Sequence, residues 1–524
     1  MKESMPGLPK KSEAEMSFLG DLEARLGKTP EIKEVSDKLT TAGFEPYLVG
    51  GCLRDLLLDK NPKDWDVTTN ATPDKILGIF PDSVYENSFG TVGVKTGSKD
   101  PRLALIEITT FRLEGKYTDK RHPDEIKFAK TVEEDLSRRD FTINAMAYEV
   151  STHKRRASGL VDPFGGRKDL KNKLLRAVGN AKERFQEDAL RLMRALRLAS
   201  QLGFDIEDET AAAISEKSGL LEFIAKERIA GEFNKLLMTD GAVEGIRRME
   251  KLGLLKYVMP ELREGIDCEQ NKHHKYTVFE HNLKALQYAV DKNFPLELRL
   301  ASLLHDIGKP RARQWRDDPR GTKINKGHNG DWTFYQHQYI GEKMALQILG
   351  RLKYPKETIE NVALLIREHM FVYDPEIVTP RGVRRMLSRV GADNINDLIL
   401  LREADRIGSG VPKAQPYRLR SLKAAIEKAK LEPIHPKMLA INGNDIMELL
   451  QISPGPKIGQ ILAILLDGVL DDPKLNDKEV LLVEIKKLGA LADSELLKLA
   501  DESKKKAVDV QKRIDEEIDK KYFV

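Results

Sequence analysis

The chain has 524 residues, of which 40% are hydrophobic, so it is long enough for several domains with separate cores. Its 87 basic and 83 acidic residues leave a net charge of +4, which permits a nucleic-acid partner without requiring one. The two cysteines match no disulfide or metal spacing, and no apolar run is long enough to span a bilayer. These features argue against a disulfide scaffold or a membrane protein and predict a soluble cytoplasmic protein.

The stretch from Tyr47 to Thr69 is the first informative one, after a polar extension over 1–30 and a predicted helix over 31–42. Tyr47-Leu48-Val49 is typical of the end of a buried strand, and the Gly50-Gly51 pair lets the backbone approach a ligand closely. A helix predicted over 52–58 presents N–H groups in its first turn to an anion, with Arg54 beside them. The pattern predicts a phosphate site.

Two aspartates follow in a predicted strand over 64–69, and strand periodicity places Asp64 and Asp66 on one face. Two carboxylates that share a small volume are most often reconciled by a divalent cation, and oxygen ligands favour Mg²⁺. A lone D-x-D is more often a turn or a solvated strand face. The preceding GG-x-x-RD at a short fixed distance favours a phosphoryl-transfer site instead.

The next elements complete an α/β head of about 150 residues: a helix over 72–80 and strands over 90–96 and 102–111. Glu107 in the last strand is a candidate third carboxylate, although a strand glutamate is equally often solvent-facing. The polar segment 114–125 is typical of a mobile loop. A helix predicted over 137–147 places Arg139, Asp140 and Asn144 on one face, for phosphate or ribose contacts or as an ordinary capped helix.

From residue 181 to about 265 the periodicity is helical, and one predicted helix carries EDALRLMRALR, residues 187–197. Asp188 can accept a hydrogen bond from the exocyclic amine of cytosine or adenine, while Arg191 donates to ring acceptors, with Arg194 and Arg197 further along the same side. The alternative is a surface salt bridge three residues apart. With the head in front of it, we interpret this helix as a base reader.

Five motifs now occur in a fixed order: GGCLRD with DWD, IEITTF, RRDFTINAM, DPFGGRKDL and EDALRLMRALR. Together they resemble the motifs of class II tRNA nucleotidyltransferases, the CCA-adding enzymes and their bacterial poly(A) polymerase relatives, over residues 35–265. Cys52-Leu53 stands where small or β-branched residues are commoner in that family.

The resemblance implies a role for each matching residue. Asp64 and Asp66 would be the catalytic Mg²⁺ ligands, with Glu107 as a supporting carboxylate. Gly51, Arg54 and Arg139 would contact the triphosphate. Asp188 and Arg191 would pair with CTP or ATP, with Arg194 and Arg197 nearby. The loop with Arg112, Tyr117, Asp119 and Arg121 resembles the flexible loop that addition of A requires, which favours addition of the whole CCA.

Beyond residue 265 the histidines concentrate, and a metal scheme can be drawn from His281, His305, Asp306, His337, His369 and Asp405. Imidazole and carboxylate ligands suit Mn²⁺, Fe²⁺, Ni²⁺ or Zn²⁺. A His-Asp dipeptide alone is more often a capped core histidine. The order of the six residues resembles the HD phosphohydrolase superfamily, which implies a metal site and, as an open alternative, hydrolysis of RNA phosphoesters. Gln336 stands before His337 where glycine is more usual.

The sequence therefore predicts a multi-domain α/β + α protein: a polymerase beta-like nucleotidyltransferase head, an all-helical neck, an HD body and a helical tail. The predicted boundaries are an extension over 1–30, the head over 31–180, the neck over 181–265, the HD domain over 266–410 and the tail over 411–524. The expected activity is template-independent CCA addition to tRNA, held at its acceptor stem and elbow, from CTP and ATP. The alternatives are an A-adding enzyme or poly(A) polymerase and, from another class, an HD phosphohydrolase.

Overall fold

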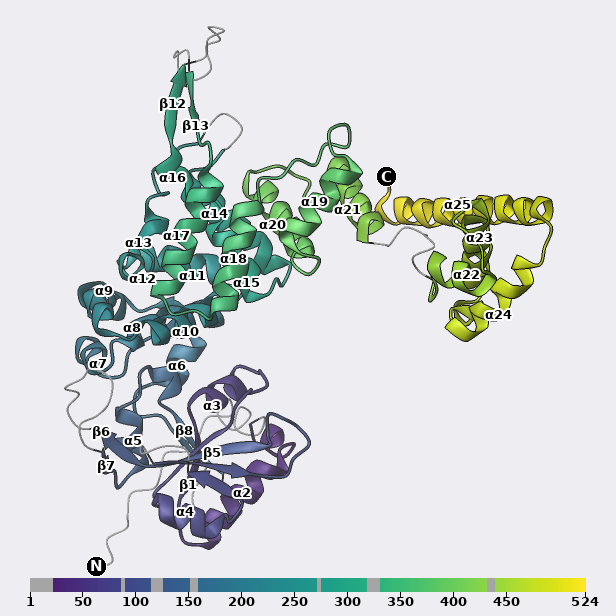
Figure 1. The fold of residues 1–524 in the computed structure, drawn as a ribbon. Helices are drawn as coiled ribbons and strands as arrows, with labels where there is room; N and C mark the ends of the chain where they lie inside the picture. Colours follow the sequence, from purple (N-terminus) through teal and green to yellow (C-terminus); the bar gives the residue numbers. More distant parts are fainter. Residues whose placement is uncertain are drawn as a thin grey trace, which may run out of the picture. The chain divides into compact units, whose positions relative to one another are not determined.

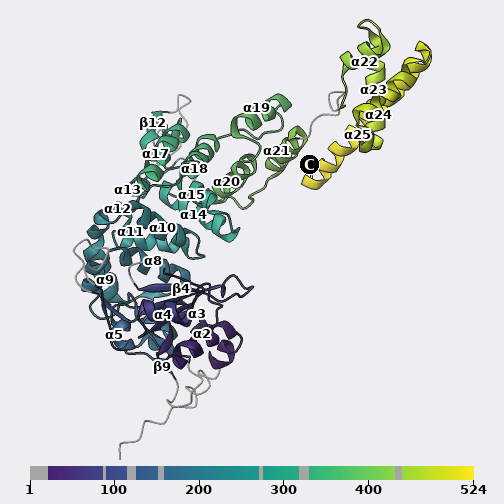
Figure 2. The same ribbon diagram turned by 60° about the horizontal axis from the view of Figure 1, so that its bottom comes forward.

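The computed structural model describes residues 22–85, 90–114, 126–150, 159–270, 275–317, 330–430 and 439–524. The chain divides into two compact units, residues 1–362 and 363–524, and the division falls within one helix, α18. Both units are drawn in Figures 1 and 2. Among the described residues, no helix is both long and apolar enough to cross a membrane.

The head is built on a seven-stranded sheet of order β3-β4-β5-β2-β1-β8-β9. β2 and β5 are parallel, and the other neighbouring strands are antiparallel. The strands are β1 (Pro46–Val49), β2 (Asp66–Thr69), β3 (Ser83–Tyr85), β4 (Thr91–Lys95), β5 (Leu105–Thr110), β8 (Ala147–Glu149) and β9 (Leu160–Val161). A separate two-stranded sheet pairs β6 (Arg112–Glu114) with β7 (Ile126–Phe128). The predicted α/β head is confirmed.

The helices of the head are α2 (Pro30–Thr41), α3 (Gly50–Leu57), α4 (Pro73–Ile79), α5 (Val132–Ser137), the 3₁₀ helix η1 (Thr142–Asn144) and α6 (Gly166–Lys171). Helices α2 and α4 lie together at one side of the sheet (Figure 1). Tyr47 and Val49 of β1 pack against Phe111 and Leu136 in a buried cluster. This cluster fixes the end of β1, from which the glycine pair begins α3.

The prediction of a helix over 137–147 is wrong. α5 ends at Ser137, and the chain continues through η1 into β8. Asp140 lies in the turn between α5 and η1. Its Oδ1 accepts hydrogen bonds from the Phe141 N–H and from Asn144 Nδ2. Short polar side chains that bond the local backbone compete with helix formation, and here a turn and a short 3₁₀ helix replace the predicted helix.

The neck is helical apart from the two-residue strand β11 (Asp205–Ile206), which pairs with β10 (Leu174–Leu175) of the head. Its helices are α7 (Ala181–Glu187), α8 (Leu190–Leu202), α9 (Asp208–Lys217), η2 (Ser218–Phe223), α10 (Lys226–Leu237), α11 (Ala242–Lys251), α12 (Leu255–Val258) and α13 (Pro260–Arg263). A single helix over 187–197 is therefore not found. Asp188 lies between α7 and α8, because its side chain accepts the Leu190 N–H and starts a new helix there.

The next segment of the first unit carries α14 (Val278–Asp291), α15 (Leu296–Leu304), α16 (Lys309–Ala312), α17 (His337–Arg351) and the first part of α18 (Lys356–Glu368). Between α16 and α17 stands an antiparallel hairpin of β12 (Gln314–Asp317) and β13 (Gly330–Thr333), which the sequence analysis did not predict. Buried Arg299 of α15 donates to the carbonyl oxygens of Leu237 and Phe294, at 2.8 Å each. It thereby ties α15 to the end of α10 in the neck.

The second unit is helical as predicted. Its helices are α19 (Pro380–Val390), α20 (Ile395–Gly408), α21 (Tyr417–Lys430), α22 (Gly443–Leu450), α23 (Pro456–Asp471), η4 (Pro473–Leu475), α24 (Lys478–Gly489) and α25 (Asp493–Tyr522). Helices α22 to α25 share a core that includes Ile446, Ile461 and Ile485. The far end of α25 reaches α21, where Glu427 accepts bonds from Lys521 and Tyr522.

Candidate active site and metal cluster

Two carboxylates lie side by side on the parallel strands β2 and β5. Asp66 and Glu107 are register partners, so their side chains extend on the same face of the sheet. Glu107 is exposed and Asp66 is half-buried. Asp64 is exposed and precedes β2, which begins only at Asp66, so the predicted strand over 64–69 is too long by two residues. The proximity of Asp64 nevertheless shows in its effect on the pKa of Asp66.

Burial raises the pKa of Asp66, the Arg139 guanidinium opposes this rise, and the neighbouring charge of Asp64 adds to it. The backbone at Gly50 approaches the same two groups. A Cβ added there would lie 3.0 Å from Arg139 Nη1 and 3.4 Å from Asp66 Oδ2, and Gly50 has a φ of +71° that side chains rarely adopt. The Gly50 backbone, the Asp66 carboxylate and the Arg139 guanidinium therefore lie close together at the start of α3.

Arg54 has a different environment from the one predicted. Its guanidinium is buried and donates to Asp55 Oδ1 at 2.6 and 2.8 Å and to Asn144 Oδ1 at 2.9 Å. These bonds tie α3 to η1. Cys52 is also internal: it donates to the Val49 carbonyl at 2.9 Å, and burial raises the pKa of its thiol to about 12. The thiol is therefore protonated and inert at neutral pH.

An acid–arginine pair joins the head to the neck. Asp140 accepts from Arg194 Nε at 2.8 Å and lies 2.7 Å from its Nη2. Burial would raise the pKa of Asp140, but Arg194 and Arg191 outweigh it and hold the pKa at about 2. Asp140 is thus ionised at every physiological pH, and it orients Arg194 from the side of the head.

Asp188 also has an arginine partner that the sequence analysis missed. Arg228 of α10 donates to Asp188 Oδ2 at 3.1 Å, while Oδ1 accepts the Leu190 N–H. Arg191 is buried and donates to Glu187 at 2.5 Å and to the Arg138 carbonyl at 3.2 Å. Both predicted base-reading residues are consequently fixed before any ligand arrives. A carboxylate has about four lone-pair sites, so Asp188 can still accept another donor.

Many of these groups, but not Asp64, Cys52 or Arg54, line one cavity of about 460 Å³. Its walls come from α3, β2, β4, β5, η1, α8 and α10, and its lining residues include Gly50, Gly51, Asp66, Thr91, Glu107, Thr109, Arg112, Arg138, Arg139, Asp140, Asn144, Asp188, Arg191, Arg194 and Arg228. Segments separated by more than a hundred residues in the sequence thus share one polar, arginine-rich space. Such a space fits a polyanionic ligand with a base attached.

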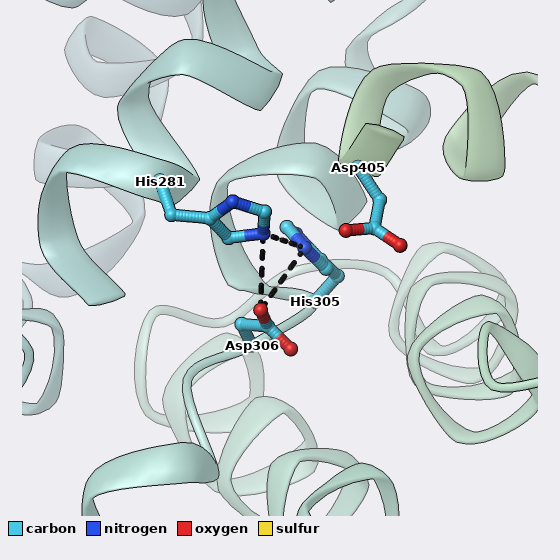
Figure 3. Close-up of side chains that lie close together, drawn as sticks. All are labelled: His281, His305, Asp306 and Asp405. Carbon is cyan, nitrogen blue, oxygen red and sulfur yellow. Dashed lines mark hydrogen bonds and ion pairs between the residues drawn. The ribbon is translucent and has the colours of Figure 1, made fainter. Parts of the chain in front are cut away.

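The histidine cluster is formed by His281, His305, Asp306 and His337, and it lies around the turn that follows α15. His281 Nε2 of α14 lies 2.8 Å from His305 Nε2 and 3.0 Å from Asp306 Oδ2, and Figure 3 shows the three side chains facing one another. His337 at the start of α17 approaches Asp306 Oδ1 at 3.2 Å. All four side chains are buried. Three imidazoles and one carboxylate thus lie close together, and these donor types suit a transition metal.

Backbone contacts orient two of these rings. His305 Nδ1 lies 2.9 Å from the Ser302 carbonyl, and His337 Nδ1 lies 2.7 Å from the Phe334 carbonyl. A carbonyl can only accept, so each Nδ1 carries the proton and each Nε2 lone pair faces the cluster. This is the tautomer that a metal-binding histidine needs, and it argues against a merely capped core histidine.

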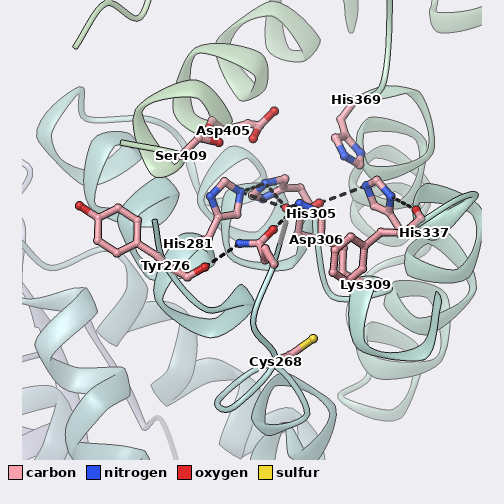
Figure 4. A network of polar contacts seen from close by, with 12 residues as sticks. Cys268, Tyr276, His281, His305, Asp306, Lys309, His337, His369, Asp405 and Ser409 are labelled. Atoms are coloured by element: carbon pink, nitrogen blue, oxygen red, sulfur yellow. Dashed lines mark hydrogen bonds and ion pairs between the residues drawn. The ribbon is translucent and has the colours of Figure 1, made fainter. Parts of the chain in front are cut away.

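Lys309 completes the surroundings of Asp306. Its Nζ lies 2.5 Å from Asp306 Oδ2 and 2.7 Å from Gln270 Oε1, and Figure 4 shows Lys309 and His337 beside Asp306. Burial would raise the pKa of Asp306, but Lys309 and the histidines outweigh it and hold it well below its usual range. Asp306 is therefore a carboxylate, ready to ligate a cation.

Two further residues explain the local chain path. A Cβ at Gly308 would lie 2.2 Å from the His337 carbonyl, so only glycine lets this turn touch α17. Gln336 has a φ of +60°, the left-handed conformation in which glycine is favoured. The departure from the usual Gly-His thus changes the residue but keeps the backbone geometry. His369, whose Nδ1 lies 2.6 Å from the Ile366 carbonyl, and Asp405 of α20 are buried in the second unit.

Comparison with known protein families matches the Poly A polymerase head domain over residues 46–176, a probable RNA and SrmB-binding site of polymerase A over 203–266, and the HD domain over 278–409. The chain is 33% identical over 476 residues to the CCA-adding enzyme of Lactococcus lactis subsp. lactis, covering 88% of this chain and 100% of that protein. The chain belongs to the CCA-adding enzyme family of tRNA nucleotidyltransferases. An A-adding tRNA nucleotidyltransferase of Deinococcus radiodurans is also 33% identical, over 432 residues, covering 80% of this chain and 90% of that protein.

Solved structures of the family agree with the fold. The Bacillus stearothermophilus CCA-adding enzyme in complex with CTP has a TM-score of 0.56 at 26% sequence identity, covering 87% of this chain and 96% of that chain. The Thermotoga maritima CCA-adding enzyme complexed with tRNA has a TM-score of 0.50 at 20% identity, covering 87% and 94%. The predicted family and fold class, with a nucleotidyltransferase head, a helical neck and an HD domain, are confirmed.

The individual site residues of this family member remain predictions, but the structure shows which of them it gathers. Of the predicted nucleotidyltransferase residues, the cavity is lined by Gly51, Asp66, Glu107, Arg112, Arg139, Asp188, Arg191 and Arg194. Arg54 is bonded to Asp55 and Asn144, and Arg197 forms an ion pair of 2.7 Å with Glu232. Tyr117, Asp119 and Arg121 of the predicted loop lie outside the described residues. The sequence analysis missed Arg138, although it begins the RRDFTINAM motif, and Arg228, which carried no signal beyond its charge.

Proposed function

We propose that this protein adds CCA to the 3′ end of tRNA from CTP and ATP, with release of pyrophosphate. The observation that carries the proposal is the single cavity in which the β2–β5 carboxylates, the glycine turn and the arginines of the neck meet. A nucleoside triphosphate needs a cation-rich cradle at one end and a hydrogen-bonding partner for its base at the other. The family membership supports the same activity, and a tRNA substrate agrees with the predicted cytoplasmic location.

In this proposal Asp64 and Asp66 hold Mg²⁺ with Glu107 in support. The raised pKa of Asp66 fits this role, because a divalent cation would relieve the crowding of two carboxylates. When bound there, Mg²⁺ would lower the pKa of the attacking hydroxyl and neutralise phosphate charge. Arg139 would bind the triphosphate beside Gly50 and Gly51, and the 3′ hydroxyl of tRNA would attack the α-phosphate.

We propose further that Asp188 and Arg191 select the base. Cytosine and adenine each present an exocyclic amine from which Asp188 can accept a hydrogen bond. Next to that amine is a ring nitrogen to which Arg191 can donate one. Their existing bonds to Arg228 and to Glu187 keep the two side chains in place. Uracil and guanine lack that amine at the matching position, so the enzyme would discriminate against UTP and GTP without a nucleic-acid template.

The test is to sequence the 3′ ends of tRNA that lacks CCA after incubation with CTP alone, ATP alone or both. The proposal requires CC from CTP alone and CCA from the mixture. Addition of A only, or of long A tails, would assign the protein to the A-adding or poly(A) polymerase branch instead. Asp66→Ala should abolish incorporation, whereas Asp82→Ala, an exposed aspartate of the head outside the cavity, should not.

A second candidate function rests on the histidine cluster. We propose that His281, His305, Asp306 and His337, together with His369 and Asp405 as the family order implies, bind Mn²⁺, Fe²⁺, Ni²⁺ or Zn²⁺. A metal-bound water at this site would hydrolyse a phosphoester at an RNA end. Hydrolysis of 2′,3′-cyclic phosphates with added Ni²⁺ or Mn²⁺ should be lost in His305→Ala and kept in Asp66→Ala. Activity that survives His305→Ala would refute the assignment.

A further inference from the structure

The β12–β13 hairpin carries aromatic and arginine side chains on both of its faces, because consecutive strand residues such as Trp315 and Arg316 extend to opposite sides. Trp315 and Trp332 are opposite each other in the register, with ring centroids 5.2 Å apart and planes at 81°. The guanidinium carbon of Arg313 lies 3.7 Å from the Trp332 ring centroid, and that of Arg316 lies 4.7 Å from the Tyr335 ring centroid. Figure 1 shows the strands projecting beyond α16 and α17.

Two of the three tryptophans of the chain lie in this hairpin, and neither is buried. Trp315 is 40% exposed and Tyr335 is 66% exposed, whereas Trp65, the third tryptophan, is 4% exposed and belongs to the head core. A soluble protein gains stability by burying such large rings. Exposed rings with arginines stacked on them are typical of surfaces that bind unpaired nucleic acid, because bases stack on the rings and phosphates pair with the guanidinium groups.

The hairpin is also connected directly to the histidine cluster. It follows Asp306 and Lys309 in the chain and precedes His337, so both of its strands begin or end within a few residues of the cluster. Phe334, the residue after β13, accepts the bond from His337 Nδ1, and Lys309 Nζ lies 5.8 Å from its ring centroid. The end of the hairpin at Phe334 therefore adjoins the histidine cluster.

We propose that the β12–β13 hairpin is a binding surface for unpaired RNA, on which Trp315 and Tyr335 stack bases while Arg313 and Arg316 contact phosphates. The surface brings an RNA strand to the histidine cluster, so the substrate of that cluster is an oligoribonucleotide with an unpaired end. RNA binding by the hairpin rests on its own side chains, whereas use of that RNA by the cluster rests on the second candidate function.

A simpler role for the Trp315–Trp332 pair is to stabilise the hairpin, since a two-stranded sheet is only marginally stable by itself. Such a role accounts for the pair but not for the stacking of Arg316 on Tyr335, because Tyr335 lies outside the strand pairing. The experiment must therefore separate loss of folding from loss of binding.

The proposal is tested by crosslinking a 4-thiouridine-labelled oligoribonucleotide of about ten nucleotides to the full-length protein and mapping the modified peptides. Crosslinks are expected on the peptides that contain Trp315, Trp332 and Tyr335. Trp315→Ala should weaken binding of the same oligonucleotide about 5-fold to 100-fold. Trp315→Tyr should restore most of the affinity, because a tyrosine ring still stacks. Arg316→Gln should weaken binding and reduce the slope of log affinity against log salt by about 1.

The matched control is Tyr85→Ala, which removes another exposed ring, 46% accessible, from the head outside the lining of its cavity. It should leave hairpin crosslinking unchanged. The exciton signal of the two tryptophans in circular dichroism reports whether Arg316→Gln keeps the hairpin folded. Crosslinks confined to the head and neck, or equal affinity in Trp315→Ala and Tyr85→Ala, would overturn the proposal. A change in oligomeric state on Trp315→Ala with unchanged RNA binding would identify a protein interface instead.

The same variants separate this proposal from the proposed functions. CCA addition should be retained in Arg316→Gln and lost in Asp66→Ala, while Asp66→Ala should keep the hairpin crosslinks. Loss of cluster-dependent hydrolysis of an oligoribonucleotide in Arg316→Gln, with hydrolysis of a cyclic mononucleotide retained, would show that the hairpin supplies the RNA. If His305→Ala abolishes neither hydrolysis, the cluster proposal fails while the binding proposal stands on its own crosslinks.

Discussion

The substitution Gly50→Ala tests whether the start of α3 is built for a close approach. Gly50 has a φ of +71°, and an added Cβ would lie 3.0 Å from Arg139 Nη1 and 3.4 Å from Asp66 Oδ2. The first distance is tighter than ordinary van der Waals contact, so the guanidinium must move by a few tenths of an ångström. Arg139 is proposed to bind the triphosphate and Asp66 to hold Mg²⁺, so the displacement falls on the reacting end of the substrate.

The expected effect has two parts of different origin. A left-handed conformation destabilises a non-glycine residue by about 1 kcal/mol, which should lower the free energy of unfolding by that amount. The displacement of Arg139 should lower kcat/KM for nucleotide incorporation by about tenfold to a hundredfold, since small errors in position are costly at a reacting centre. Gly43 supplies the control, because its φ is +88° and nothing lies within 4 Å of an added Cβ.

The assay compares Gly50→Ala and Gly43→Ala by urea unfolding and by steady-state incorporation of CTP into tRNA lacking its end. Both variants should lose similar stability, and only Gly50→Ala should lose activity beyond what its unfolded fraction explains. Equal kcat/KM in the two variants would refute the reasoning, because it would show that the contact with Arg139 and Asp66 has no functional weight.

Three further outcomes follow from buried charges. Asp140 has a folded pKa of about 2, which is below its unfolded value. Its stabilising effect is therefore complete above pH 4 and decreases as the pH falls toward 2. In urea unfolding, the difference in unfolding free energy between wild type and Asp140→Asn should be about 1 kcal/mol smaller at pH 3 than at pH 6. Arg299→Met should lower the unfolding free energy by about 2–4 kcal/mol, because it leaves buried carbonyl groups unbonded, whereas exposed Arg381→Met should change it little. Arg228→Met should raise KM for CTP and ATP with little change in KM for tRNA, measured by steady-state kinetics, because Asp188 loses its partner.

The head could be predicted well because its signals are local. The glycine pair, the DWD tripeptide and the strand with Glu107 each act through their own backbone, and the register places Asp66 beside Glu107 as the alternation of strand residues implies. The turn after α15 also depends on a single residue, since Gly308 allows the close approach to α17 that brings His337 to Asp306.

The failures occur where a side chain replaces a backbone bond. Asp188 and Asp140 were both placed inside helices, and both instead bond a neighbouring N–H while an arginine from a distant helix neutralises their charge. Periodicity cannot reveal this competition, because the deciding partner, Arg228 or Arg194, lies 40 or 54 residues away. The β12–β13 hairpin was missed for a related reason: its strands are short, and the Trp315–Trp332 contact that holds them is formed only across the register.

The small net charge of the chain did not indicate the arginine-rich cavity, because nearby acidic side chains balance the charges of its arginines. Three of its arginines are each matched by an acid: Arg139 with Asp135 at 3.4 Å, Arg194 with Asp140, and Arg228 with Asp188. A chain built this way stays near neutrality overall, yet each guanidinium has five N–H donors and the pair uses only some of them. The acid fixes the plane of the guanidinium before the ligand binds, so less side-chain freedom is lost on binding than with isolated surface lysines. The +4 charge of the whole chain is therefore compatible with a site that binds a polyanion, and the arrangement of the pairs, not their sum, makes the site.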